Sequence, residues 1–371
     1  MSQRAMTILV GGDLVLDEPD GAYWLSGIAP AVRGADLAVA HLEVPHTDSR
    51  AELHGDVPAP GAPVENLAAI AGAGFHMLSL AGNHMADCGP QGIADTMAGL
   101  DALGIGHAGA GPSLAAARAP VVRQVAGRRV ALLSYNCVGP QNGWAGPDTP
   151  GVAYLRVEPE DGGPIAPAAN LARIAPEALA MLRQDIAAAR GQADIVLVAM
   201  HKGLVHTPAR LAPYERALAQ AAIQVGADAV LGHHAHIIRG VEFHRGRPIF
   251  HGLGNACVVT SALSPGQDHP ARAAWAERRK ALFGFEPDPA YTLAPFHPEA
   301  VHAFLGQIHI AADGAITAGM IPVFVEAPGR PVLATGERAD AVRRYLEQIT
   351  VAAGLPPITI AQDGTIRESA A

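Results

Sequence analysis

The chain has 371 residues, of which 49% are hydrophobic and 16% are charged, and its formal net charge is −9. This composition is typical of a globular protein with a large core, and the negative charge argues against nucleic acid as a main partner. The cysteines Cys88, Cys137 and Cys257 are odd in number and form no CxxC pair. We therefore expect buried thiols in a reducing cytoplasm rather than a disulfide framework.

The N-terminal sequence and the apolar runs predict a protein that is neither exported nor anchored. The opening residues, MSQRAMTILVGGD, lack the apolar stretch of roughly 7–15 residues that a signal peptide carries. No uncharged apolar run reaches the roughly 20 residues that a membrane-spanning helix needs. A cytoplasmic protein without a membrane partner is expected.

Short apolar runs alternate with helical patterns along much of the chain. Runs typical of buried strands occur at 6–10, 37–40, 76–80, 129–134, 194–200, 228–231 and 248–251. Apolar residues at three- and four-residue spacing predict helices over 63–73, 90–103, 174–190 and 211–225. After about residue 238 the pattern favours strands at 239–244, 248–253, 304–311 and 316–325, and then a last helix at 337–353. This alternation predicts an α/β protein whose two sheets pack together under helices, in one domain over residues 1–371.

Two segments show no clean period. Residues 138–172 are rich in Pro and Gly, and residues 260–303 contain FGFEPDPAYTLAPFHPEAVHAF. Long irregular segments in compact domains are usually lids or linkers. Because the second segment is too aromatic for a solvated linker, we expect irregular lids, with the second one ordered over the site.

Ionisable and amide side chains follow five of the predicted strands. In chain order these are Asp13, His41 with Glu43, Asn83 with His84 and Asp87, His201, and the cluster His233, His234 and His236. In an open α/β sheet, ligands bind beyond the carboxyl ends of the strands. Along an extended chain, His234 and His236 would point to the same face. The sequence therefore predicts one site at a sheet edge.

The order GD, LE, GNH, a lone His and GHHxH resembles the calcineurin-like metallophosphoesterase superfamily. It resembles more closely the bacterial capsule-synthesis branch, the CapA (poly-γ-glutamate) family, whose SLGNF stretch is similar to GLGNAC at 252–257. The resemblance covers roughly residues 6–260 and, more weakly, the chain to about 353. It implies a four-layer α-β-β-α sandwich, the calcineurin-like metallophosphatase fold.

Carried over by motif, the resemblance implies positions for two divalent metals. The ligands implied for the first metal are Asp13, Glu43 and His236. Those implied for the second are Glu43 as a bridge, Asn83, His201 and His234. Mixed carboxylate and imidazole ligands suit Mn, Zn or Fe. In this scheme His84 is the acid/base residue, and Asp87 orients it.

The first motif departs from the phosphatase pattern, which begins Asp-x-His. Here it reads Asp13-Leu14-Val15, so one imidazole of the first metal is missing, and the bridging position is Glu43 rather than Asp. The metal centre would then be incomplete and the metal dispensable. The remaining acids and bases would still form acid/base pairs, because a carboxylate orients an imidazole and supports its charged form.

Two such pairs are what an epimerase needs on the two sides of its substrate. His84 with Asp87 makes one pair, and Asp13 would make the other with His297, which lies in the second lid. Within the CapA-like branch, a subgroup that tailors ribosomal peptides includes an epimerase acting near the C-terminus of a lasso-peptide precursor. The chain is similar to that enzyme, so the favoured function is an isomerase that inverts a Cα centre of a precursor peptide without an organic cofactor.

Further residues are expected to contact that peptide. They are His41, His233, Trp144 and Arg239. A tryptophan can stack on an apolar residue, and an arginine fork can bind a terminal carboxylate. The simpler alternative is that Trp144 packs half-buried and Arg239 is solvated.

Two other functions remain open from the sequence. One is metal-dependent hydrolysis of a phosphoester or amide, of the poly-γ-glutamate or capsule type, which the retained metal motifs favour. The other is a non-catalytic module that binds an anionic or peptide polymer, which the departure in the first motif favours.

Overall fold

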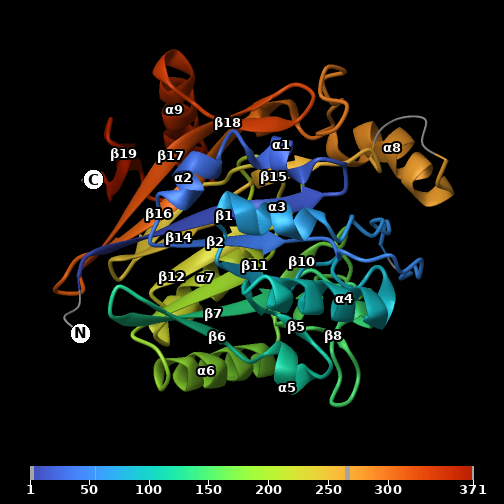
Figure 1. The fold of residues 1–371 in the computed structure, drawn as a ribbon, viewed down its shortest axis with the longest axis horizontal. Helices are drawn as coiled ribbons and strands as arrows, with labels where there is room; N and C mark the ends of the chain where they lie inside the picture. Colours follow the sequence, from blue (N-terminus) through green and yellow to red (C-terminus); the bar gives the residue numbers. More distant parts are fainter. Residues whose placement is uncertain (1–3, 55, 264–267, 370–371) are drawn as a thin grey trace.

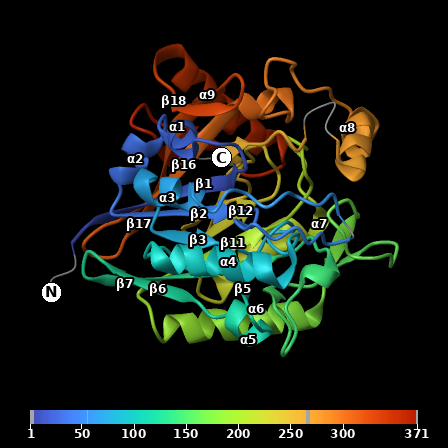
Figure 2. The same cartoon turned by 45° about the vertical axis from the view of Figure 1, so that its right-hand side comes forward.

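The computed structural model describes residues 4–54, 56–263 and 268–369. Two sheets pack against each other, and helices cover the outer face of each (Figures 1 and 2). All three cysteines are free, buried thiols. Within the described ranges, no helix combines the length and the apolar character needed to cross a membrane.

The larger sheet is mixed and has ten strands. They are β1 (Met6–Leu16), β2 (Leu37–Leu42), β3 (Met77–Ser79), β4 (Gly106–Ala108), β15 (Asn255–Val259), β16 (His302–Ile310), β17 (Ile316–Glu326), β18 (Arg330–Leu333), β19 (Ile358–Ile360) and β20 (Thr365–Glu368). Their spatial order is β19-β20-β17-β16-β1-β2-β3-β4, with β15 beside β1 and β18 beside β17. Strands β1 to β4 are parallel neighbours, whereas β16 and β17 join antiparallel.

The smaller sheet has six strands in the order β13-β14-β12-β11-β7-β6. They are β6 (Val121–Val125), β7 (Arg128–Asn136), β11 (Ile195–His201), β12 (Ala229–His233), β13 (Val241–His244) and β14 (Arg247–Phe250). Two short pairs lie outside both sheets: β5 (Ala110–Gly111) with β8 (Gly151–Val152), and β9 (Val157–Pro159) with β10 (Leu171–Ile174). Strands β7, β11 and β12 are parallel, so their carboxyl ends meet at one edge.

The helices occupy the outer layers and one end of the molecule. They are α1 (Gly21–Leu25), α2 (Ala29–Arg33), α3 (Asn66–Ala73), α4 (Gly89–Ala102), α5 (Leu114–Ala117), α6 (Pro176–Arg190), α7 (Pro213–Gln224), α8 (Pro270–Phe283) and α9 (Gly336–Ala352), with the 3₁₀ turns η1 (Gln141–Gly143) and η2 (Pro298–Val301). Helices α1 to α4 cover the larger sheet, and α6 and α7 cover the smaller one. Helix α9 packs on β16 and β17 (Figure 1).

Alternation along the strands explains the layers. On β1, Ile8 and Val10 pack between the two sheets, whereas Leu9 packs beneath the helices of the outer face. On β11, Leu197 faces the space between the sheets and Val198 faces α6 and α7. The predicted four-layer α-β-β-α sandwich is confirmed.

The two segments predicted to be irregular are partly regular. Residues 260–303, of which 264–267 lie outside the described residues, contain α8, which lies at one edge of the molecule in both views (Figures 1 and 2). The residue of α8 that becomes buried is Arg279, so the helix has no apolar period for sequence analysis to detect. Residues 138–172 supply buried side chains such as Leu155 and Val157 to the core beneath α6 and α7, and Pro167 and Ala168 reach the cavity described below.

Candidate functional site

The predicted residues meet where strands of both sheets end. Asp13 lies in β1, Glu43 follows β2, and Asn83 follows β3 in the larger sheet. His201 and His233 are the last residues of β11 and β12 in the smaller sheet. All five are buried, so their polar atoms depend on one another for partners.

The position of Asp13 is fixed by the close approach of the backbone at Gly12 and Asp13 to the backbone at Gly254. The backbone N–H of Asp13 donates to the carbonyl of Gly254 at 2.8 Å, and the register of β1 with its neighbours shifts at this residue. A Cβ on Gly12 would lie 1.9 Å from the Gly254 oxygen, so only glycine fits before the aspartate. This is the physical reason for the GD pair in the sequence.

Asp13 is surrounded by the histidine cluster. Its Oδ1 is hydrogen-bonded to His233 Nδ1 at 3.0 Å, and its Oδ2 accepts the backbone N–H of His234 at 3.2 Å. The Nδ1 atom of His236 lies 3.7 Å from Asp13 Oδ2. Burial, together with the nearby charge of Glu43, raises the pKa of Asp13 above its usual range.

Turns, rather than an extended strand, bring His234 and His236 to the site. Strand β12 ends at His233, and His234 and His236 have φ angles of 87° and 52°. Non-glycine residues rarely adopt this left-handed conformation, and such residues concentrate at functional sites. The expectation of strand alternation was wrong, although both rings reach the site.

Glu43 carries a buried carboxylate that lacks hydrogen bonds. Neither of its oxygens has a hydrogen-bond partner. Oε1 lies 3.3 Å from His236 Nε2 and 3.9 Å from His201 Nε2. Burial alone would raise the pKa of Glu43, but the charge of His236 outweighs it and holds this pKa below its usual range. The protonated His236 supplies a positive charge that balances this buried carboxylate, and a bound divalent metal would replace that proton.

The imidazoles of His41, His201 and His234 are neutral, and each has an unpartnered nitrogen. Ser79 Oγ donates to the Ala40 carbonyl at 3.4 Å and therefore accepts Nδ1–H of His41 at 3.0 Å, which leaves His41 Nε2 as a buried lone pair without a partner. His201 Nδ1 and His234 Nε2 also lack partners. Burial lowers the pKa of His41 to about 4 and that of His234 to about 3. Neutral imidazoles are the form that binds metals.

These atoms fit a divalent metal centre. Two groups of ligand atoms lie within 4.8 Å of one another: Asp13, Glu43 and His236, and Asp13, His41 and His201. The first group is the set implied for the first metal. The second group includes His41, which was predicted as a substrate contact; the structure places one of its ring nitrogens within 4.8 Å of ligand atoms of Asp13 and His201. Asn83 contributes indirectly, because its Oδ1 is hydrogen-bonded to His201 Nε2 at 2.6 Å.

His84 and Asp87, the residues predicted to act as an acid/base pair, are in direct contact. His84 Nδ1 lies 2.7 Å from Asp87 Oδ2, which also accepts the backbone N–H of Ala59 at 2.6 Å. Burial opposes the charged ring, but Asp87 outweighs burial and raises the pKa of His84 to about 10. A protonated His84 in a cavity wall can donate a proton to a leaving group.

An open cavity with an empty volume of about 860 Å³ gives access to the cluster. Glu43, His84, His234 and His236 are among the polar residues that line it. The rest of the wall is mainly apolar and includes Val15, Val44, Val57, Pro58, Val205, Val258, Leu263, Trp275, Phe283 and Phe296. Such a mixture of an apolar wall and a few converging polar groups is typical of a small-molecule or peptide site.

Four ionisable residues of this cavity were not predicted from the sequence: Asp17, Asp56, His206 and Arg272. His206 is buried with a φ of 54°, and its backbone N–H donates to the Ala235 carbonyl at 2.9 Å, within the histidine loop. Its ring contacts those of Phe283 and Phe296. Asp17, directly after β1, was detectable by the strand-end rule, whereas tertiary packing alone brings His206 and Arg272 to the site.

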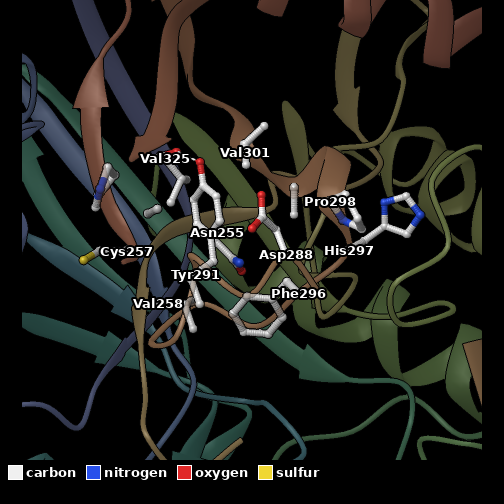
Figure 3. A pocket seen from close by; sticks show the side chains of 15 residues that line it. Asn255, Cys257, Val258, Asp288, Tyr291, Phe296, His297, Pro298, Val301 and Val325 are labelled. Carbon is white, nitrogen blue, oxygen red and sulfur yellow. Dashed lines mark hydrogen bonds between the residues drawn. The ribbon is translucent and has the colours of Figure 1, made fainter. Parts of the chain in front are cut away.

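His297 does not pair with Asp13. It accepts the backbone N–H of Glu299 at 3.2 Å, contacts Phe285 edge-on, and lines a second cavity of about 720 Å³. In that cavity it lies beside Pro298, with its ring projecting away from Asn255 (Figure 3). The three histidines of the cluster already surround Asp13, so the predicted second acid/base pair is wrong.

Two predicted substrate contacts also lie elsewhere. Trp144 stacks on Tyr154, with ring centroids 4.0 Å apart, and lines a different pocket beside Met181. Arg239 is fully buried and donates to Glu215 Oε1 at 3.1 Å and to the carbonyl of Leu204. Because its guanidinium is buried and hydrogen-bonded to these two groups, it is not free to bind a terminal carboxylate of a substrate. His233, the fourth predicted contact, is buried behind Asp13.

Arg239 belongs to a buried ion cluster behind the site. Glu215 also accepts from Lys202 Nζ at 2.8 Å, and Lys202 donates to the His251 carbonyl at 3.1 Å. Lys202 directly follows His201, so the cluster anchors the end of β11. These two cations outweigh burial and lower the pKa of Glu215 to about 2.

Glu215→Gln is expected to destabilise the fold by about 3–5 kcal/mol, because it leaves two buried cations without their carboxylate. Since the folded-state pKa of Glu215 is depressed, its contribution is present above its unfolded pKa of 4.5 and is lost as pH falls towards about 2. Denaturant unfolding between pH 3 and 7 measures both effects. The exposed Glu368→Gln is the control, and equal stability of the two variants would contradict the expectation.

The fold and the site together define the class of protein. Two packed sheets under helices, with carboxylates and histidines clustered where strands of both sheets end, form an α/β sandwich with a candidate metal site. The chain belongs to the family of the bacterial capsule synthesis protein PGA_cap, whose family model matches residues 7–259.

Curated relatives agree with this family. Capsule biosynthesis protein CapA of Bacillus anthracis is 30% identical over 195 residues, which are 52% of this chain and 42% of that protein. PGA biosynthesis protein CapA of Bacillus subtilis (strain 168) is 29% identical over 235 residues, 62% of this chain and 54% of that protein. The chain thus spans about half the length of these relatives.

Among solved structures, the calcineurin-like phosphoesterase YfkN of Bacillus subtilis superposes with a TM-score of 0.40 at 10% sequence identity. The superposition covers 94% of this chain and 99% of that one.

Proposed function

We propose that this chain is a metal-dependent hydrolase that cleaves an amide or ester bond of a peptide-type substrate. The observation that carries the proposal is the buried Glu43 carboxylate, which has no hydrogen-bond partner beside His236 and His201. The residues that would hold the metal are Asp13, Glu43, His236, His41 and His201. When bound, a divalent cation would polarise the scissile group and activate a water molecule.

The chain's own residues would supply binding and proton transfer. His84, held protonated by Asp87, donates a proton to the leaving group from the cavity wall. The apolar wall around Phe296 and Trp275 binds an apolar part of the substrate and excludes water from the reacting bond.

The charges of the cavity favour a peptide over a polyanion. The names of the relatives suggest a role in making a capsule polymer. However, the cavity has three carboxylates, Asp17, Glu43 and Asp56, and a single arginine, Arg272, whose Nε donates to the Pro58 carbonyl. Asp17 and Asp56 would favour a neutral or cationic peptide group beside them, whereas the protonated His84 and a bound metal would face the reacting bond. A precursor peptide remains the proposed partner, without nucleic acid or membrane, in the cytoplasm.

A second candidate is epimerisation of a ribosomal (lasso) precursor peptide near its C-terminus. The observation that favours it is the apolar Val15, which lines the cavity at the position where the phosphatase pattern Asp-x-His has an imidazole. His84 with Asp87 would remove or return the Cα proton on one side. With His297 outside this cavity, Glu43 with His236 is the other available pair. Such an isomerase would need no metal.

Treatment with EDTA followed by Mn²⁺ separates these functions. Hydrolysis of a chromogenic peptide anilide should stop with EDTA and return with Mn²⁺. Epimerisation should continue in EDTA and introduce solvent deuterium at Cα of a candidate peptide in D₂O, without cleaving it. Deuterium uptake with no cleavage would reject the hydrolase, and absence of both reactions with retained peptide binding would indicate a non-catalytic module.

A further inference from the structure

Asp17 is an acid of the cavity that neither proposed reaction uses. It follows β1 directly and lines the same cavity as Glu43 and His84. One oxygen, Oδ2, accepts the hydroxyl of Thr260 at 2.6 Å. The other, Oδ1, is buried and has no hydrogen-bond partner. A buried acceptor of this kind normally has a donor, so its donor is expected to come from a ligand.

Among the described residues, Asp17 forms no ion pair within 4.0 Å. Arg272 lines the same cavity and its charge partly offsets the effect of burial on Asp17, but its Nε donates to the Pro58 carbonyl at 2.7 Å. Burial accordingly raises the pKa of Asp17 to about 7. The adjacent Glu18 accepts the backbone N–H of Ser261 and adds further negative charge.

The other acid of the outer cavity is already satisfied. Asp56 accepts Nδ2–H of Asn83 at 2.7 Å through Oδ2 and the backbone N–H of Val57 at 2.8 Å through Oδ1. Among the three acids that line the cavity, Glu43 faces the histidine cluster, and Asp17 is left as the acid available to a substrate.

We propose that Asp17 anchors a protonated amine of the substrate, so that the cavity selects a peptide carrying an ammonium group next to an apolar side chain. The ammonium would donate to Oδ1 and supply the missing positive charge, while the apolar side chain would pack on the wall around Val44 and Val258. The inference rests on the proposed function because it places this substrate in the same cavity. Asp17 is thus a specificity-determining residue rather than part of the reacting cluster.

Binding of two small peptides to the full chain tests this anchor. The probes are phenylalanyl-glycinamide, which has a free ammonium group, and its N-acetyl form, which does not. Titration is followed by NMR at pH 8 in EDTA, so that the result does not depend on metal or turnover. The wild type should bind the ammonium form about tenfold more tightly, because a charge-assisted hydrogen bond is lost on acetylation.

Three variants make the test specific. Asp17→Asn should reduce the preference to less than about twofold. Thr260→Val keeps the carboxylate and should retain the preference, which controls for disturbance of the loop. Glu18→Gln is the matched control, because Glu18 is a neighbouring acid that does not line the cavity.

Several outcomes would overturn the anchor. These are undetectable binding of the ammonium form, equal binding of both probes by the wild type, or an unchanged preference in Asp17→Asn. Because peptide binding is measured in EDTA, the measured preference for the ammonium group does not depend on whether the chain is a metal-dependent hydrolase. Conversely, the absence of this preference would not argue against metal-dependent hydrolysis.

Discussion

Glu43→Gln is expected to reduce Mn²⁺ affinity by at least about 100-fold and to abolish metal-dependent hydrolysis. Loss of an outer-shell partner of a metal ligand typically costs 10–100-fold in affinity, and Glu43 would be a direct ligand shared by the cluster. Glutamine keeps the size of the side chain but removes the negative charge. Metal content after dialysis against Mn²⁺, measured by mass spectrometry, checks the affinity directly.

The control for Glu43→Gln is Glu18→Gln, which removes a nearby carboxylate outside the cluster. It should leave the metal content at the wild-type value. Wild-type metal content in Glu43→Gln would contradict the metal centre. If neither the wild type nor the variant binds Mn²⁺, the epimerase becomes the better account of the same residues.

His84→Asn is expected to lower kcat by about 10²–10⁴-fold, the usual contribution of a positioned acid or base. The metal content should stay unchanged, because His84 belongs to neither group of clustered ligand atoms among the described residues. Asp87→Asn should have a smaller effect, since Asp87 acts by holding the ring of His84 at 2.7 Å.

The measurement for His84→Asn is turnover of the peptide anilide with Mn²⁺ and, separately, deuterium uptake at Cα in D₂O. The rate of whichever reaction the wild type catalyses should be reduced in His84→Asn. An unchanged kcat, or a loss of metal equal to that in Glu43→Gln, would show that His84 does not act as the proton donor. Circular dichroism distinguishes either result from unfolding.

The sequence alone was sufficient for most of the fold. The buried strands are short continuous apolar runs, and the helices α3, α4, α6, α7 and α9 carry an apolar period, so local pattern and tertiary burial agree. Helix α8 escaped prediction because its buried residue is Arg279, which donates to the Pro295 and Leu263 carbonyls instead of packing an apolar face. Short elements such as α1 and α5 have too few residues to show a period.

The sequence by itself determined which strands end in acids and histidines, and parallel strands necessarily bring those ends together. Within each sheet, Asp13 with Glu43 and His201 with His233 were therefore predictable as neighbours, whereas the packing of the two sheets and the turns after β12 complete the cluster. Only the tertiary structure decided the use of residues whose environment is not local. His41 keeps an unpartnered Nε2 because its Nδ1 is hydrogen-bonded to Ser79. The guanidinium of Arg239 is hydrogen-bonded to Glu215, and His297 lines a different cavity. Such roles depend on which donors and acceptors the packing leaves unpartnered, and no spacing along the chain encodes that.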